Sequence, residues 1–133
     1  PHYEERNDFP YFEKIQQIST MESHNVKNCA ASALSYSMDY EQLVSTNAGD
    51  NSVVVFDVDQ ETGLLTRNFC LPISGEYPKD AELFPDKRYL VSLNHESNTM
   101  TFFYVDLDKH TIAMNGPEVP LNAPNCLLFH KLK

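Results

Sequence analysis

The sequence lacks tryptophan, contains only four glycines and is short of positive charge. Its 10 lysines and arginines stand against 19 aspartates and glutamates, which gives a formal net charge of −9 at pH 7. Nucleic acids and anionic membrane surfaces are bound by clustered basic residues. No apolar run approaches the roughly 20 residues of a membrane-spanning helix. We therefore expect neither a nucleic acid nor a membrane as a partner.

Cysteine and histidine are too sparse and too scattered for a familiar metal motif. Cys29, Cys70 and Cys126 lie far apart, no CxxC is present, and the five histidines show no paired spacing. A glycine-rich phosphate loop and a GxSxG elbow are also missing. We expect no metal, no cofactor, and three reduced thiols packed as small apolar residues. Reduced thiols are typical of a reducing compartment, so the expected location is cytoplasmic.

The sequence does contain an internal repeat. The stretch "QLVSTNAGDNSVVVFDVDQETGLL", which begins at Gln42, aligns without gaps with "YLVSLNHESNTMTFFYVDLDKHTI", which begins at Tyr89. The identical pairs are all 47 positions apart: Leu43/Leu90, Val44/Val91, Ser45/Ser92, Asn47/Asn94, Asn51/Asn98, Phe56/Phe103, Val58/Val105 and Asp59/Asp106. A unit of this length built from short strands predicts a β-propeller blade or a related repeat.

The hydrophobic pattern predicts an all-β chain of about ten strands, arranged as two four-stranded antiparallel blades with a flanking strand at each end. In this division residues 12–27 supply the outer strand and loop of a preceding blade, 28–74 and 75–121 form two blades, and 122–133 form a closing strand. The flanking strands are expected at Phe12–Ser19, where a helix is the alternative, and at Asn125–Leu132.

Two further expectations concern burial and turns. Small or apolar side chains on the central strands should be buried: Ala31, Ala33, Val53, Val55, Ala81, Leu90 and Phe102. Gly63 suits a turn with positive φ, whereas its repeat partner is His110, so the second turn should be built differently.

Chain reversal at each turn places the loop before a blade's first strand and the loop between its second and third strands at the same rim. Lys79 and His95 are the candidate catalytic residues at that rim, as a cation and as a base that titrates near neutral pH. Asp80, Glu96 and His24 are candidate binding residues. The alternative for each of them is a turn or a solvated loop residue.

Three stretches resemble one family. "STNAGDNSVVVFDVDQETGLL", "YPKDAELFPDKRYLVSLNHESNTMTFFYVD" and the ending "APNCLLFHKL" are similar to lactonase-type seven-bladed β-propellers. That family includes 6-phosphogluconolactonases and fungal muconate-lactonising enzymes. The resemblance implies that this chain is about the C-terminal third of such a protein. It also implies a small lactone or sugar acid as the ligand. Because two blades alone leave apolar faces and strand edges uncovered, we expect the remaining blades or a second copy of the chain as a partner.

The resemblance also marks three departures. Family enzymes often carry an acidic residue where this chain has Ser32 or its neighbour, an arginine where it has Ala48, and an arginine where it has Lys79. Lysine keeps the charge but loses the planar fork that binds a carboxylate or phosphate through two hydrogen bonds. Three function classes stay open: a lactone hydrolase, a propeller that binds a small molecule or a partner without catalysis, and a structural segment whose function lies in other blades.

Overall fold

The computed structural model describes residues 2–6, 9–22 and 28–133. The described residues form eleven strands and no helix. It follows that they contain no helix that is long and apolar enough to cross a bilayer. The all-β prediction is confirmed, and the strands pair with antiparallel neighbours throughout.

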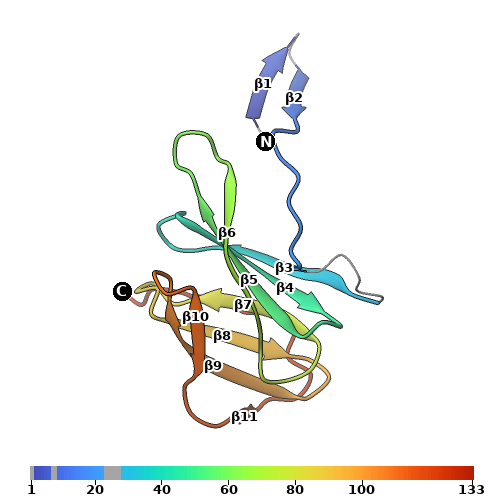
Figure 1. The fold of residues 1–133 in the computed structure, drawn as a ribbon, viewed down its shortest axis with the longest axis vertical. Coiled ribbons are helices and arrows are strands. Elements are labelled where there is room, and N and C mark those ends of the chain that lie inside the picture. The colour runs from blue at the N-terminus through green and yellow to red at the C-terminus, as the bar shows by residue number, and fades with distance from the viewer. Residues whose placement is uncertain (1, 7–8, 23–27) are drawn as a thin grey trace.

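The strands form two main sheets and one small hairpin (Figure 1). The first sheet, blade 1, has the order β3 (Ala30–Tyr36), β4 (Gln42–Ala48), β5 (Ser52–Val58) and β6 (Leu65–Pro72). The second, blade 2, has the order β7 (Pro78–Leu83), β8 (Tyr89–Asn94), β9 (Thr99–Asp106) and β10 (Thr111–Met114), and short β11 (Val119–Pro120) also pairs with β9. The hairpin of β1 (His2–Arg6) and β2 (Phe9–Glu13) stands apart from both sheets.

The sequence repeat reappears in the backbone. Leu43 pairs with Phe56 in blade 1 as Leu90 pairs with Phe103 in blade 2. Positive φ angles also recur 47 positions apart, in the pairs Asn28/Gly75, Tyr40/Lys87, Asn51/Asn98 and Gly63/His110. The last pair corrects our expectation, because His110 adopts a φ of 55° and the turn has the same handedness as at Gly63. Asp59 and Asp106 each accept backbone N–H bonds inside these turns. These bonds support the same turn in both blades, although blade 2 has a histidine where blade 1 has a glycine.

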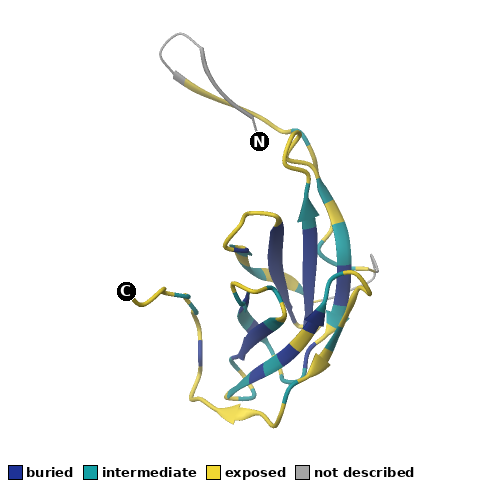
Figure 2. Ribbon diagram, turned by 90° about the vertical axis from the view of Figure 1, so that its left-hand side faces the viewer, coloured by how far each residue is buried: buried dark blue, intermediate teal, exposed yellow. Residues whose placement is uncertain are grey.

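The main core lies between the two sheets, where Figure 2 shows the buried residues concentrated. It joins Val44, Val53, Val55, Phe69 and Ile73 of blade 1 to Ala81, Leu83, Leu90, Phe103 and Val105 of blade 2. Three burial predictions were wrong: Ala31 is exposed, and Ala33 and Phe102 are only partly buried. Ala31 and Ala33 lie on β3, an edge strand with a neighbour on one side only.

The predicted flanking strands are not formed as expected: β2 (Phe9–Glu13) contains only the first two residues of the Phe12–Ser19 prediction, and Asn125–Leu132 is not a strand. β2 ends at Glu13, and residues 14–22 run past β6 without joining it. Side chains hold this segment instead: the Gln16 amide bonds the Leu65 backbone in both directions, at 2.9 and 2.7 Å, and Arg67 donates to the Ser19 carbonyl at 2.6 Å. The C-terminal segment 121–133 is also not a strand: it contacts the edge strand β7 through the Asp80 side chain, without a backbone ladder among the described residues.

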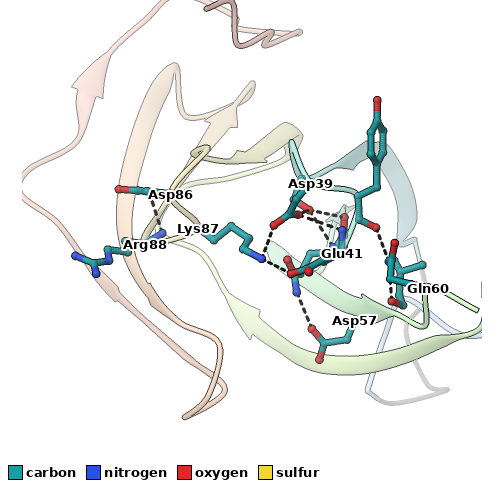
Figure 3. A network of polar contacts seen from close by, with 11 residues as sticks. Asp39, Glu41, Asp57, Gln60, Asp86, Lys87 and Arg88 are labelled. Atoms are coloured by element: carbon teal, nitrogen blue, oxygen red, sulfur yellow. Dashed lines mark hydrogen bonds and ion pairs between the residues drawn. The ribbon is translucent and has the colours of Figure 1, made fainter.

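A charged clamp joins the sheets at one end (Figure 3). Lys87, in the β7–β8 turn, bonds the carboxylates of Asp39 and Glu41 in blade 1, each at 2.6 Å. The hydrogen bond from Lys87, with further bonds from Ser37 and the Glu41 backbone, lowers the pKa of Asp39 from 3.8 to about 2. Burial lowers the pKa of Lys87, but the bonds from both carboxylates raise it more, so its pKa is raised overall.

Candidate functional site

The opposite end of the sheets is the predicted rim, and backbone contacts bring its loops together. The His95 and Glu96 amides donate to the Tyr77 and Glu76 carbonyls at 3.0 and 3.2 Å. The Tyr77 amide in turn donates to the Asn51 side chain of blade 1 at 2.9 Å. The β4–β5 turn, the entry to β7 and the β8–β9 turn therefore form one continuous edge.

Lys79 occupies a β-bulge at this edge. The register of β7 against β8 shifts between Pro78 and Asp80, which leaves Lys79 as the extra residue. Bulges re-aim a side chain and are common beside active sites. The Lys79 ammonium lies 4.8 Å from the centre of the Tyr77 ring, a cation–π contact that keeps it at the rim.

His95 follows the last residue of β8 and is half-buried. Its Nδ1 lies 3.2 Å from the carbonyl oxygen of Pro124, which belongs to the rim-crossing segment 123–127. A carbonyl oxygen only accepts, so this contact is a hydrogen bond when Nδ1 carries the proton. In that tautomer Nε2 is left as a proton acceptor.

The three predicted binding residues have different outcomes. Asp80 is occupied by backbone: Oδ1 accepts from its neighbour Ala81 and Oδ2 from Leu127, at 2.9 and 2.8 Å. Glu96 is exposed on the β8–β9 turn, adjacent to His95. His24 lies outside the described residues.

Two asparagines that repeat between the blades have a structural role. Asn94 is fully buried and donates to the Ser74 carbonyl at 2.9 Å, and Asn47 is fully buried and donates to the Thr20 carbonyl at 3.0 Å. Each of these bonds ties the second strand of a blade to the connection that enters the same blade. The two amides therefore fix the loops without facing solvent. Asp50 likewise accepts from Ser52 within its own turn.

Two of the three departure positions are also used internally. Ser32 is the bulged residue of β3, and its hydroxyl donates to the Pro78 carbonyl at 2.6 Å and contacts the Thr46 hydroxyl at 2.9 Å. Ala48 is buried, with 2% of its surface exposed. Neither position presents a charged group at the rim.

Comparison of the two blades isolates the rim residues that differ. The four positions predicted as site residues in blade 2 align, 47 positions away, with small residues in blade 1. The aligned pairs are Ser32/Lys79, Ala33/Asp80, Ala48/His95 and Gly49/Glu96. The blades therefore share their scaffold at this rim, but only blade 2 carries titratable side chains at these four positions.

The charge of the rim is negative. The β4–β5 turn, the entry to β7 and the β8–β9 turn together carry one lysine, Lys79, and four carboxylates: Asp50, Glu76, Asp80 and Glu96. On the blade 1 side, a hollow of about 250 Å³ is lined by Met21, Glu22, Asp50, Ser52, Cys70 and Pro72. Burial raises the pKa of the Cys70 thiol, which keeps it protonated and unreactive. Among the described residues, no group of three or more histidines, cysteines or carboxylates is arranged to hold a metal ion.

The family model of a lactonase with a seven-bladed β-propeller matches residues 2–129. The chain belongs to this family. It is 26% identical over 118 residues to the 6-phosphogluconolactonase of Bacillus subtilis strain 168, which covers 89% of the chain and 34% of that protein. The chain therefore spans about a third of the length of this relative.

Solved structures show that this lactonase-family chain has the propeller fold. It matches the periplasmic gluconolactonase PpgL of Pseudomonas aeruginosa with a TM-score of 0.75 and 22% identity, over 93% of the chain and 34% of that structure. It matches a putative 6-phosphogluconolactonase of Bacteroides fragilis with a TM-score of 0.75 and 20% identity, over 97% of the chain and 35% of that structure. The two sheets are thus two blades of a seven-bladed propeller.

Sequence reasoning missed two rim groups of this lactonase-family chain. One is the Pro124 carbonyl, which no sequence pattern could reveal because the group belongs to the backbone. The other is Asn98, whose Oδ1 accepts from the Ala123 amide at 2.9 Å. A signal for Asn98 was available, since its repeat partner is the identical Asn51.

Proposed function

We propose that this chain is part of an enzyme that hydrolyses the lactone of a sugar acid, with Lys79 and His95 at the reacting ester. The observation that carries the proposal is the placement of two residues on one rim of a lactonase-family propeller: a lysine in a β-bulge, and a histidine whose Nδ1 faces a backbone carbonyl. The names of the relatives support lactones as the substrate class.

The proposed reaction opens the lactone ring with water. His95 Nε2 takes a proton from water as the water oxygen bonds the carbonyl carbon. The Lys79 ammonium stabilises the negative charge that develops on the carbonyl oxygen. The carbon–oxygen bond of the ring then breaks, and the ring oxygen receives the proton from His95. The product is an open-chain hydroxy acid.

The remaining blades complete the rim in this proposal. The departures at Ser32 and Ala48 remove two charges that family enzymes often carry, so other blades must supply the groups that bind the sugar hydroxyls. Such blades, or a second copy of the chain, would also cover the apolar surface that the edge strand β3 exposes, which includes Leu34 at 69% and Tyr36 at 56%.

The test follows proton release from glucono-δ-lactone and from its 6-phosphate by the full-length protein. We expect turnover, and we expect His95→Ala and Lys79→Ala each to lower kcat at least about a hundredfold, the usual contribution of one acid–base or oxyanion group. Lys109→Ala, an exposed lysine in the β9–β10 turn, is the matched control and should leave kcat unchanged. Unchanged turnover in both rim variants would contradict the assigned roles.

A propeller that binds without catalysis is the second candidate. It is favoured by the four carboxylates around one lysine, which disfavour an anionic oxyanion site. Calorimetry separates the two candidates: a ligand that binds the parent protein without being turned over would move the protein to the binding class.

A further inference from the structure

The rim-crossing segment 123–127 contacts blade 2 through three side chains. Asn98 Oδ1 accepts from the Ala123 amide at 2.9 Å, His95 Nδ1 lies 3.2 Å from the Pro124 carbonyl, and Asp80 Oδ2 accepts from the Leu127 amide at 2.8 Å. These three holders come from β7 and the β8–β9 turn of blade 2. Pro124 is buried although its neighbours on both sides are exposed.

Blade 1 contains the same attachment without the histidine. Asn51 Oδ1 accepts from the Tyr77 amide at 2.9 Å, as Asn98 accepts from Ala123. The two donating residues also share a positive φ, of 58° at Tyr77 and 44° at Ala123. The position of His95 is occupied in blade 1 by Ala48. The attachment is therefore a feature of the scaffold, and blade 2 has added an imidazole to it.

The carbonyl of Pro124 is well suited to select a tautomer. It accepts only, so it favours the imidazole form that carries its proton on Nδ1. The position of this carbonyl depends on two hydrogen bonds in the same segment. The Ala123 amide donates to Asn98, and the Leu127 amide donates to Asp80. Second partners of this kind fix ring orientation and tautomer in many histidine sites.

We propose that Asn98 and Asp80 are positioning residues that hold the 123–127 segment so that the Pro124 carbonyl fixes the tautomer of His95. This arrangement keeps the Nε2 atom of His95 unprotonated and directed away from the Pro124 carbonyl. Its consequence for catalysis rests on the proposed function, whereas the tautomer itself does not.

The test measures the tautomer of His95 in the full-length protein by long-range proton–nitrogen NMR at a pH of about 8, where an ordinary histidine is neutral. Asn98→Gly removes the side-chain acceptor, and glycine suits the φ of 53° at this position. Asn98→Asp keeps an oxygen acceptor and should restore the parent state. Asn51→Gly, at a φ of 56°, is the matched control because it breaks the equivalent bond in blade 1.

We expect the proton on Nδ1 in the parent protein, in Asn98→Asp and in Asn51→Gly, and a mixture of both tautomers in Asn98→Gly. Should Asn98→Gly fail to fold, Asp80→Ala replaces it, since Ala33 occupies that position in blade 1. Where lactone is turned over, Asn98→Gly should lower kcat about fivefold with little change in KM, as expected for the loss of one hydrogen bond.

Two results would overturn the inference: a parent protein with the His95 proton on Nε2, or an unchanged tautomer in Asn98→Gly. An equal change in Asn51→Gly would also contradict it, because the effect would then be unspecific. A parent protein that hydrolyses no lactone would contradict the proposed function alone, since the tautomer measurement needs no substrate.

Discussion

Replacement of the two repeated asparagines by alanine should have unequal effects, although both side chains are fully buried. Asn94 uses its whole amide: it donates to the Ser74 carbonyl and to the Thr99 hydroxyl, and its Oδ1 accepts from Ser92. The Oδ1 of Asn47 is buried and has no hydrogen-bond partner among the described residues. Asn94→Ala therefore leaves the buried Ser92 hydroxyl without its acceptor, whereas Asn47→Ala also removes an unsatisfied atom.

The expected costs follow from these bonds. A buried polar group that loses its partner costs about 1–3 kcal/mol, and each further lost hydrogen bond costs about 1 kcal/mol. Asn94→Ala should therefore lower the free energy of unfolding by about 3 kcal/mol, and Asn47→Ala by about half of that. Urea unfolding of the full-length protein, followed by circular dichroism, measures both values, provided that the m-value is unchanged. Equal losses, or a larger loss for Asn47→Ala, would refute the reasoning.

Three other perturbations test the scaffold. The pKa of Asp39 is about 2 in the folded chain and 3.8 in its ordinary state, so its bond to Lys87 stabilises the fold above about pH 4 and is lost as the pH falls towards 2. Lys87→Met should lower the free energy of unfolding by only about 0.5 kcal/mol at pH 7, because the pair is partly exposed. The loss should be smaller at pH 2, where Asp39 becomes protonated, and an equal loss at both pH values would contradict this. Gly75→Ala places a Cβ against the Asn94 amide at a φ of 122° and should cost well over the roughly 1 kcal/mol of Gly116→Ala, where φ is 84° and no described atom beyond the chain neighbours lies within 4 Å; thermal melts compare the two. The 133-residue chain alone should associate through the exposed face of β3, and light scattering that finds a monomer at dilute concentration would contradict this.

The repeat predicted the two blades well because it is a local pattern. Strand pairing across a tight turn depends on residues close in sequence, so Leu43 and Phe56 could be placed opposite each other once the turn at Asn47–Asn51 was recognised. The ends were predicted badly for the complementary reason. Residues 14–22 and 121–133 contact the edge strands β6 and β7, but side chains rather than a backbone ladder make these contacts, and composition alone does not show which of the two a segment will form.

The candidate site was also predicted only in part, because some of its contacts depend on segments that lie far away in the sequence. Counting chain reversals was enough to place Lys79 and His95 at one rim, and the backbone bond from His95 to Tyr77 brings their loops together. The occupation of the Asp80 carboxylate could not be predicted, since it depends on the path of the distant segment that carries Leu127. Sequence reasoning thus found which side chains share an edge, but not which of them the backbone had already engaged.

The repeat also gives the experiments their reference state. Blade 1 is a natural example of the same rim with Ala48 in place of His95 and Ser32 in place of Lys79, and its bulge and register are otherwise the same. His95→Ala and Lys79→Ser would therefore convert the rim of blade 2 into side chains that the fold already accepts one blade away. Loss of turnover in these variants would consequently report on chemistry at the rim, because the scaffold has been shown by its own repeat to tolerate the change.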